Sequence, residues 1–187
     1  SYYSDITPFG ACTDPTLTGA SQASAVCGSG SANINLTGMV ANSTGNAIDY
    51  TINGVAQTQV TGINANASGN ASFSTASLTT ANNGQALVIT KITNGGCSTN
   101  FSQSLTLQVE TAGSWTGAVS TDWNTSGNWS CNTLPTSTTD VTIPVVSNLP
   151  VVNTSGSAVC RNITIDANAS VTVNTGKDLS VYGNWTN

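Results

Sequence analysis

Few residues in this chain have side chains able to take part in a reaction. The chain carries eight acids, three basic residues and no histidine, so neither a Ser-His-Asp nor a Cys-His arrangement can form. Asp122 and Asp140 are a carboxylate pair of the kind that glycosidases use, but both acids are more typical of residues that cap turns. We therefore expect a protein that is not an enzyme. We also expect no cofactor and no metal site, because no EF-hand-like spacing of oxygen ligands appears.

The five cysteines predict disulfides rather than metal binding. They form no CxxC pair, and no histidine is present to complete a zinc site. We expect Cys27 to pair with Cys97, because each sits in a Gly-rich turn beside a strand, and Cys131 to pair with Cys160. Cys12 is then unpaired or bonded to another chain, although all three pairings among Cys12, Cys27 and Cys97 stay open. Disulfides in turn predict an oxidising compartment and an extracellular protein.

Low charge limits the partners of the chain. Only 6% of the residues are charged, against about 25% in an average globular protein. The formal net charge is −5, and Lys91, Arg161 and Lys177 are the only basic residues, which excludes the basic patch that nucleic acid requires. No apolar run approaches the length of a membrane span, so no membrane insertion is expected. No signal peptide is visible, and we expect a mature or excised segment.

Ser, Thr, Asn and Gly replace the missing charges, a composition that favours short strands and tight turns over helices. Apolar and polar residues alternate from Ala32 to Leu36 and again from Ile48 to Ile52. The pair Asn53-Gly54 then predicts a hairpin. About seven such strands predict an all-β, immunoglobulin-like (Ig-like) β-sandwich over residues 14–110.

The pattern changes over residues 111–187. Apolar pairs recur every eight residues at Ile163 and Ile165, then at Val171 and Val173, and then at Leu179 and Val181. Turn residues fill the intervals between the pairs. This spacing fits successive faces of a short parallel β-solenoid or a β-meander, and the absence of Asn-Gly or Asp-Gly hairpin pairs favours the solenoid.

All four tryptophans lie in this second region, and two interpretations apply to them. Flat aromatic rings can stack on sugars, so Trp115, Trp123, Trp129 and Trp185 are candidates for carbohydrate binding. The favoured interpretation is structural, because the first three cluster just ahead of the first solenoid strand, where a cap would bury them.

Residues 1–13 form an N-terminal extension that carries Tyr2, Tyr3, Ile6 and Phe9. One interpretation is an ordinary first strand or linker. The other is a donated strand, in which these four side chains enter the sheet edge of another subunit. An apolar segment with so few charges needs cover, which motivates the second interpretation.

Asn-x-Ser/Thr sequons recur along the chain, although an Asn- and Thr-rich composition generates many of them by coincidence. A glycan coat would protect strand edges that lack charges. The candidate glycan acceptors are Asn35, Asn42, Asn66, Asn70, Asn100, Asn124, Asn128, Asn153, Asn162, Asn168 and Asn184.

Several segments of the second region form a recognisable series: WTG at 115–117, DWN at 122–124, GNWSC at 127–131, LPT at 134–136, DVTIP at 140–144, VCRNITI at 159–165 and GNWTN at 183–187. Together these segments resemble a repeat in large secreted surface proteins of Bacteroidetes. YTINGVA at 50–56 and NNGQ at 82–85 resemble an Ig-like repeat of the same class. The resemblance covers residues 14–187 and implies an adhesin-like chain exported by the type IX pathway.

The sequence thus predicts a structural segment of an extracellular bacterial surface adhesin or filament, which polymerises by β-strand addition. Its expected partners are copies of itself or neighbouring repeats in a surface polymer. The alternative is a carbohydrate-binding module of a secreted protein, whose partners would be host or environmental glycans.

Overall fold

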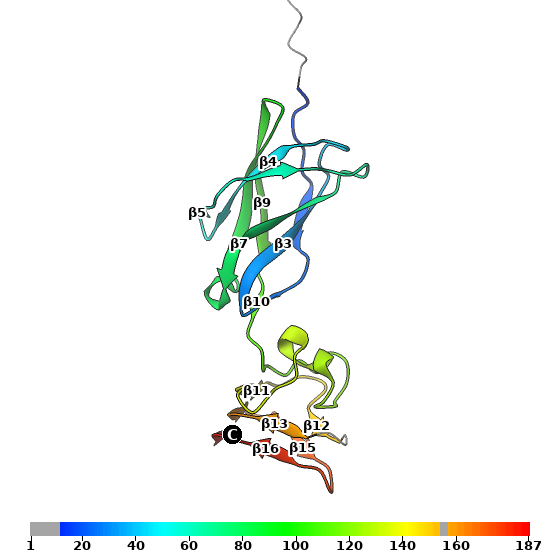
Figure 1. Ribbon diagram of the computed structural model, residues 1–187, viewed down its shortest axis with the longest axis vertical. Helices are drawn as coiled ribbons and strands as arrows, with labels where there is room; N and C mark the ends of the chain where they lie inside the picture. Colours follow the sequence, from blue (N-terminus) through cyan, green and yellow to red (C-terminus); the bar gives the residue numbers. More distant parts are fainter. Residues whose placement is uncertain (1–11, 154–156) are drawn as a thin grey trace, which may run out of the picture. The chain divides into compact units, whose positions relative to one another are not determined.

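The computed structural model describes residues 12–153 and 157–187, so the predicted strand donor at residues 2–9 lies outside the described part (Figure 1). The chain divides into two compact units. Of the described residues, one unit comprises 12–25 and 30–108, and the other comprises Val26–Ser29, 109–153 and 157–187. The predicted boundary after residue 110 lies close to this division. The assignment of Val26–Ser29 to the sandwich was wrong.

The first unit is built from two sheets. One has the strand order β1-β3-β7, and the other has the order β5-β4-β8-β9, with β6 also paired to β4. The strands are β1 (Gly19–Gln22), β3 (Ser29–Thr37), β4 (Asn46–Ile52), β5 (Val55–Ala56), β6 (Val60–Ile63), β7 (Ala71–Thr79), β8 (Ala86–Asn94) and β9 (Cys97–Thr106). A short 3₁₀ turn, η1 (Thr80–Asn82), follows β7.

The sheets pack through the alternating residues that the sequence indicates. Buried residues recur at every second position in β3 and β4. The rings of Tyr50 on β4 and Phe73 on β7 lie with centroids 5.2 Å apart and join the two sheets. Asn53 and Gly54 both have positive φ, as a type I′ hairpin requires. After this hairpin the strand is interrupted, because β5 ends at Ala56 and β6 begins only at Val60.

The strand order confirms an Ig-like sandwich. We count the strands of the sandwich in chain order, with β5 and β6 together as the fourth. The first, second and fifth strands (β1, β3 and β7) then form one sheet, and the third, sixth and seventh strands (β4, β8 and β9) form the other. The fourth position, occupied by β5 and β6, lies on the sheet of β4. β7 therefore remains at a sheet edge, where a constant-type Ig domain has a further strand.

The second unit is a parallel β-solenoid, visible in Figure 1 as the stacked pairs β13 with β16 and β12 with β15. It has three faces, with the strand orders β11-β14-β17, β12-β15 and β13-β16. The strands are β11 (Val141–Ile143), β12 (Val151–Val152), β13 (Ala158–Cys160), β14 (Ile163–Ile165), β15 (Thr172–Val173), β16 (Leu179–Val181) and β17 (Trp185–Thr186). The solenoid prediction is confirmed, and the meander alternative is wrong because all these pairs are parallel.

One residue column shows the coil length. Val141 pairs with Ile163, and Ile163 pairs with Trp185, which is a step of 22 residues. A parallel bridge between Ser114 and Thr142 adds an earlier coil above β11. That coil carries two 3₁₀ turns, η2 (Ser126–Asn128) and η3 (Ser130–Asn132). Nowhere in the described ranges does a helix have the length and apolar character needed to cross a membrane.

The second unit also includes a segment from the first half of the chain. β2 (Val26–Cys27) pairs in parallel with β10 (Val109–Glu110). The N–H of Gly28 donates to the carbonyl of Glu110 at 2.7 Å. This pairing explains why Val26–Ser29 belongs to the solenoid unit although the sandwich sequence surrounds it.

Candidate functional site

The disulfides differ from the preferred pairing. Cys12 is bonded to Cys97, and Cys27 is bonded to Cys131. The β2–β10 pairing brings Cys27 beside Glu110, whose carboxylate accepts the N–H of Cys131 at 3.2 Å. The predicted bonds Cys27–Cys97 and Cys131–Cys160 are therefore wrong, and Cys12 is not the odd cysteine. Disulfides persist in oxidising compartments, so the two bonds indicate a non-reducing environment.

Cys160 is the free cysteine among the described residues, and it belongs to the solenoid core. Its side chain is fully buried, in the column above Val181. Burial raises the pKa of the thiol from 9.0 to about 11, and the charge of Asp140 acts in the same direction. The thiol therefore stays protonated and unreactive at neutral pH.

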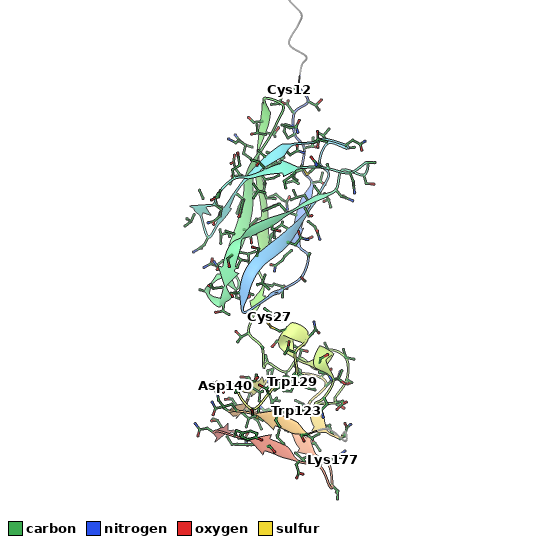
Figure 2. All side chains as sticks on the ribbon, in the orientation of Figure 1. Cys12, Cys27, Trp123, Trp129, Asp140 and Lys177 are labelled. Atoms are coloured by element: carbon green, nitrogen blue, oxygen red, sulfur yellow. A yellow bond between two sulfur atoms is a disulfide. The ribbon has the colours of Figure 1, made fainter. Side chains whose placement is uncertain are left out.

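Trp115, Trp123 and Trp129 form a cap on the first coil. Each is only 1% exposed, and Trp129 meets Trp115 and Trp123 edge to face with ring centroids 5.0 and 4.7 Å apart. The Trp129 indole N–H donates to the carbonyl of Trp123, and that of Trp115 donates to the carbonyl of Asn148, both at 2.7 Å. Figure 2 labels Trp123 and Trp129 in the second unit. The structural interpretation is confirmed for these three, and sugar stacking by them is wrong because no ring face is available.

Asn128 organises the loop that covers this cap. It is fully buried, and its side-chain oxygen accepts the N–H groups of Val119 and Ser120 at 2.9 and 2.7 Å. Its amide donates to the Ser120 hydroxyl and to the carbonyl of Asp122. The side-chain oxygen of Asn128 thus accepts two hydrogen bonds and its amide nitrogen donates two, all within the protein.

The sequons divide by exposure. Asn128 cannot be a glycan acceptor in the folded chain, because its amide is buried and bonded. Asn124 and Asn162 are half-buried. The exposed acceptors are Asn35, Asn42, Asn66, Asn70, Asn100, Asn153, Asn168 and Asn184.

The two candidate catalytic acids have separate structural partners. The Asp122 carboxylate accepts the N–H of Asn124 at 3.1 Å and the hydroxyl of Thr125 at 3.3 Å, which caps the turn as expected. Asp140 forms a two-pronged ion pair with Arg161 on the solenoid surface. Hydrogen bonds from Arg161, and to a lesser extent from Asn162, hold the pKa of Asp140 at about 2, below its ordinary 3.8, although partial desolvation opposes them.

Asp140 also begins a ladder that sequence reasoning missed. The Asn162 amide donates to the Asp140 carboxylate at 2.7 Å, and the Asn162 side-chain oxygen accepts the N–H of Asn184 at 2.8 Å. These three residues lie one coil apart, each immediately before a strand of the β11-β14-β17 face. The 22-residue spacing was visible in the sequence, but identifying the ladder requires knowing the coil length.

Trp185 and a groove beside β7 are two exposed features that could bind a partner. Trp185 is 52% exposed, and Tyr182 nearby in the sequence is 67% exposed. In the sandwich, a groove of about 250 Å³ separates the end of β7 from the β4–β5 hairpin. The groove is lined by Ile52, Asn53, Val55, Gln57, Ala76, Ser77, Leu78, Asn82 and Gln85.

The groove lies where the alternation of β7 breaks. Ala76 and Ser77 are both exposed, between the buried Thr75 and Leu78. The N–H of Ala76 donates to the hydroxyl of Tyr50 at 3.0 Å. The floor of the groove is apolar, since Ile52 and Leu78 are 6% and 1% exposed. A chain segment could therefore lay apolar side chains on this floor. Both backbone groups of Ala76 are already used within the chain, because its carbonyl accepts the hydroxyl of Thr75 at 2.7 Å.

Comparison with protein families gives a match to part of the chain. Residues 114–186 match the model of a family described as a domain of unknown function, DUF8693. No curated protein matches the chain. No solved structure matches it either. The matched residues coincide with the stacked coils, because Ser114 and Thr186 are the outermost members of one column that also contains Thr142 and Thr164.

Proposed function

We propose that this chain is a structural segment of an extracellular bacterial surface adhesin or filament, and that it assembles by β-strand addition. The observation that carries the proposal is the edge of β7, which no second strand of the described residues covers, beside a groove with an apolar floor. An unprotected edge pairs readily with another strand. The two disulfides favour durability outside the cell, since they restrict the unfolded chain.

The acceptor in this proposal is the β7 edge. The residues of β7 that line the groove are Ala76, Ser77 and Leu78. β7 carries no charged residue, although charged side chains are the usual protection of an exposed edge. An added strand would pair with β7 and occupy the position that a constant-type Ig domain fills with its own strand.

The donor in this proposal is residues 2–9 of another copy. Tyr2, Tyr3, Ile6 and Phe9 supply the apolar side chains for the groove floor. Such a contact is head-to-tail, because donor and acceptor are different surfaces. Head-to-tail contacts propagate into open polymers unless the rotation between copies closes a ring.

The test compares polymer formation by matched variants. The unaltered chain should form polymers in negative-stain electron micrographs, and deletion of residues 1–10 should abolish them. Ser77→Lys should also abolish them by placing a charge at the groove. Ser74→Lys is the matched control, since Ser74 is exposed on the same strand but does not line the groove.

A peptide of residues 1–11 separates donor from acceptor. It should bind the chain that lacks residues 1–10 and should not bind the same chain carrying Ser77→Lys, as measured by fluorescence anisotropy. Polymers that persist after the deletion would rule out strand donation by this segment.

The second candidate function is carbohydrate binding, and the exposure of Trp185 favours it. Its ring is the one among the four tryptophans with an accessible surface, and Tyr182 and Asn184 could supply further contacts to a sugar. Binding to a glycan array that disappears with Trp185→Ala and survives Trp123→Phe would support this function. A blank array would exclude the glycans tested.

A further inference from the structure

The two disulfides interleave along the chain. In chain order the bonded cysteines are Cys12, Cys27, Cys97 and Cys131, and the bonds join the first to the third and the second to the fourth. Two covalent routes therefore lead from Cys12 to Cys131. The first route follows the backbone to Cys27 and then crosses a disulfide to Cys131. The second route crosses a disulfide to Cys97 and then follows the backbone to Cys131.

Neither route passes through residues 28–96. The first route uses 15 residues of backbone and the second uses 34. Residues 28–96 contain every strand from β3 to β8 and join the two routes at Cys27 and Cys97. Tension that enters and leaves through the backbone outside residues 12–131 therefore need not pass through these strands. Both routes lie within residues 12–131, so the sequence on either side does not alter them.

The folded chain holds the first parts of the two routes side by side. In the first unit, β1 lies beside β9, and the side chain of Gln22 forms two hydrogen bonds with the backbone of Gln108, at 2.9 and 2.8 Å. In the second unit, β2 pairs with β10, where Cys27 is aligned with Glu110. From the disulfide at their start to this aligned pair, the two segments contain 15 and 13 residues. They are nearly equal in length, so both can carry a load.

We propose that the interleaved disulfides make this chain a tension-bearing tether, in which a pull along the polypeptide bypasses the strands β3 to β8. While either bond is intact, one route stays closed and these shielded strands carry no load. A fully stretched first route measures about 50 Å, so loss of the sandwich fold cannot extend the route beyond that length. Without the Cys27–Cys131 bond, the 104 residues that it spans would release about 350 Å.

The groove proposed as the acceptor lies inside the shielded strands, because its lining residues fall between Ile52 and Gln85. A pull along the backbone would therefore leave the groove unchanged. This point rests on the proposed function. The load path itself rests on the disulfides and is independent of strand donation.

The first experiment reads the two routes by length. The chain carrying Cys160→Ala, which removes the free thiol of the described residues, is held between handles at its two ends in optical tweezers. It is unfolded under constant force and then exposed to a thiol reductant. The taut first route loads the Cys27–Cys131 bond, and cleavage of this bond transfers the load to the second route.

Two lengthening steps should follow. The routes differ by 19 residues, 34 against 15, so the transfer should lengthen the chain by about 65 Å. Cleavage of the Cys12–Cys97 bond, which spans 85 residues, should then add about 290 Å. Cleavage in the opposite order should give a single step of about 350 Å, because the second route is slack while the first is closed. Absence of lengthening, or steps of other sizes, would overturn the proposed load path.

The second experiment uses matched variants that keep one route each. Before reduction, the chain carrying Cys12→Ser and Cys97→Ser should stretch to the same length as the chain with both bonds, since the first route holds both taut. The chain carrying Cys27→Ser and Cys131→Ser should be longer by about 65 Å. A variant with all four substitutions is the control, and it should show no step with the reductant. Equal stretched lengths for all four chains would overturn the tether, whereas strand donation would still be decided by its own polymer assay.

Discussion

The side-chain oxygen of Asn128 accepts the backbone N–H of Ser120 at 2.7 Å, and its amide donates to the hydroxyl of the same serine at 2.9 Å. This reciprocal contact ties the turn before Trp123 to the turn before Trp129. The tryptophan cap is therefore positioned by a buried amide as well as by apolar packing.

Asn128→Ala should destabilise the solenoid unit by about 2–3 kcal/mol, because it leaves several buried polar groups without partners. All four tryptophans lie in this unit, so denaturant unfolding followed by tryptophan fluorescence reports on it selectively. Asn153→Ala is the control, since Asn153 is exposed, and it should change stability by less than about 0.5 kcal/mol. Equal effects of the two substitutions would contradict the role of Asn128.

Non-reducing peptide mapping should recover two crosslinked peptides, one containing Cys12 with Cys97 and the other containing Cys27 with Cys131. Replacing Cys27 and Cys131 together by serine should lower the stability of the solenoid unit by about 2–4 kcal/mol. The same fluorescence assay measures this loss. Recovery of a peptide that links Cys131 to Cys160 would contradict the assignment.

Cys160 should resist thiol reagents at neutral pH until the chain is unfolded. Its pKa is raised to about 11 in the folded chain, so the folded state holds the proton more tightly than the unfolded state does. Stability from this group is complete below pH 9 and declines as the pH rises from about 9 to 11. Cys160→Ala should remove that alkaline decline, which pH-dependent unfolding can measure. Rapid labelling in the native state would show that the thiol is accessible.

Asp140 should titrate with a pKa of about 2, and Arg161→Gln should move the value back toward 3.8. The lowered pKa means that the contribution of the ion pair to stability is present above about pH 4 and is lost as the pH falls toward 2. Carboxyl-detected NMR titration measures both values. Lys177→Gln removes a cation that forms no contact with Asp140 and should leave the pKa unchanged. An unshifted Asp140 in the unaltered chain would mean that the ion pair does not persist in solution.

Much of the architecture followed from local patterns. The alternation in β3 and β4 identified the buried face, because side chains of a strand point to opposite sides in turn. Asn53 and Gly54 identified the hairpin, because both tolerate positive φ. The eight-residue spacing of apolar pairs indicated successive solenoid faces, because each face needs one short strand and one corner.

The pairing of cysteines did not follow from the sequence. Cys27 and Cys97 were predicted to pair because both lie in Gly-rich turns beside strands. In the structure, β2 pairs with β10, and this pairing places Cys27 next to Cys131. Cys160 faces inward by its place in β13, so it cannot reach a cysteine in the capping loop. The residues next to a cysteine in the sequence do not determine its disulfide partner, because the partner depends on which distant strand lies beside that cysteine in the fold.

Composition and periodicity by themselves predicted an all-β chain with a sandwich followed by a solenoid or a meander, and they selected three tryptophans for a cap. Those conclusions depend on propensity and on the two-residue period of strands, which are local properties. Tertiary structure alone decided the disulfide partners, the burial of Asn128, the Asp140–Asn162–Asn184 ladder and the position of β7 at a sheet edge. Each of these depends on contacts between residues far apart in the chain, which no local pattern encodes.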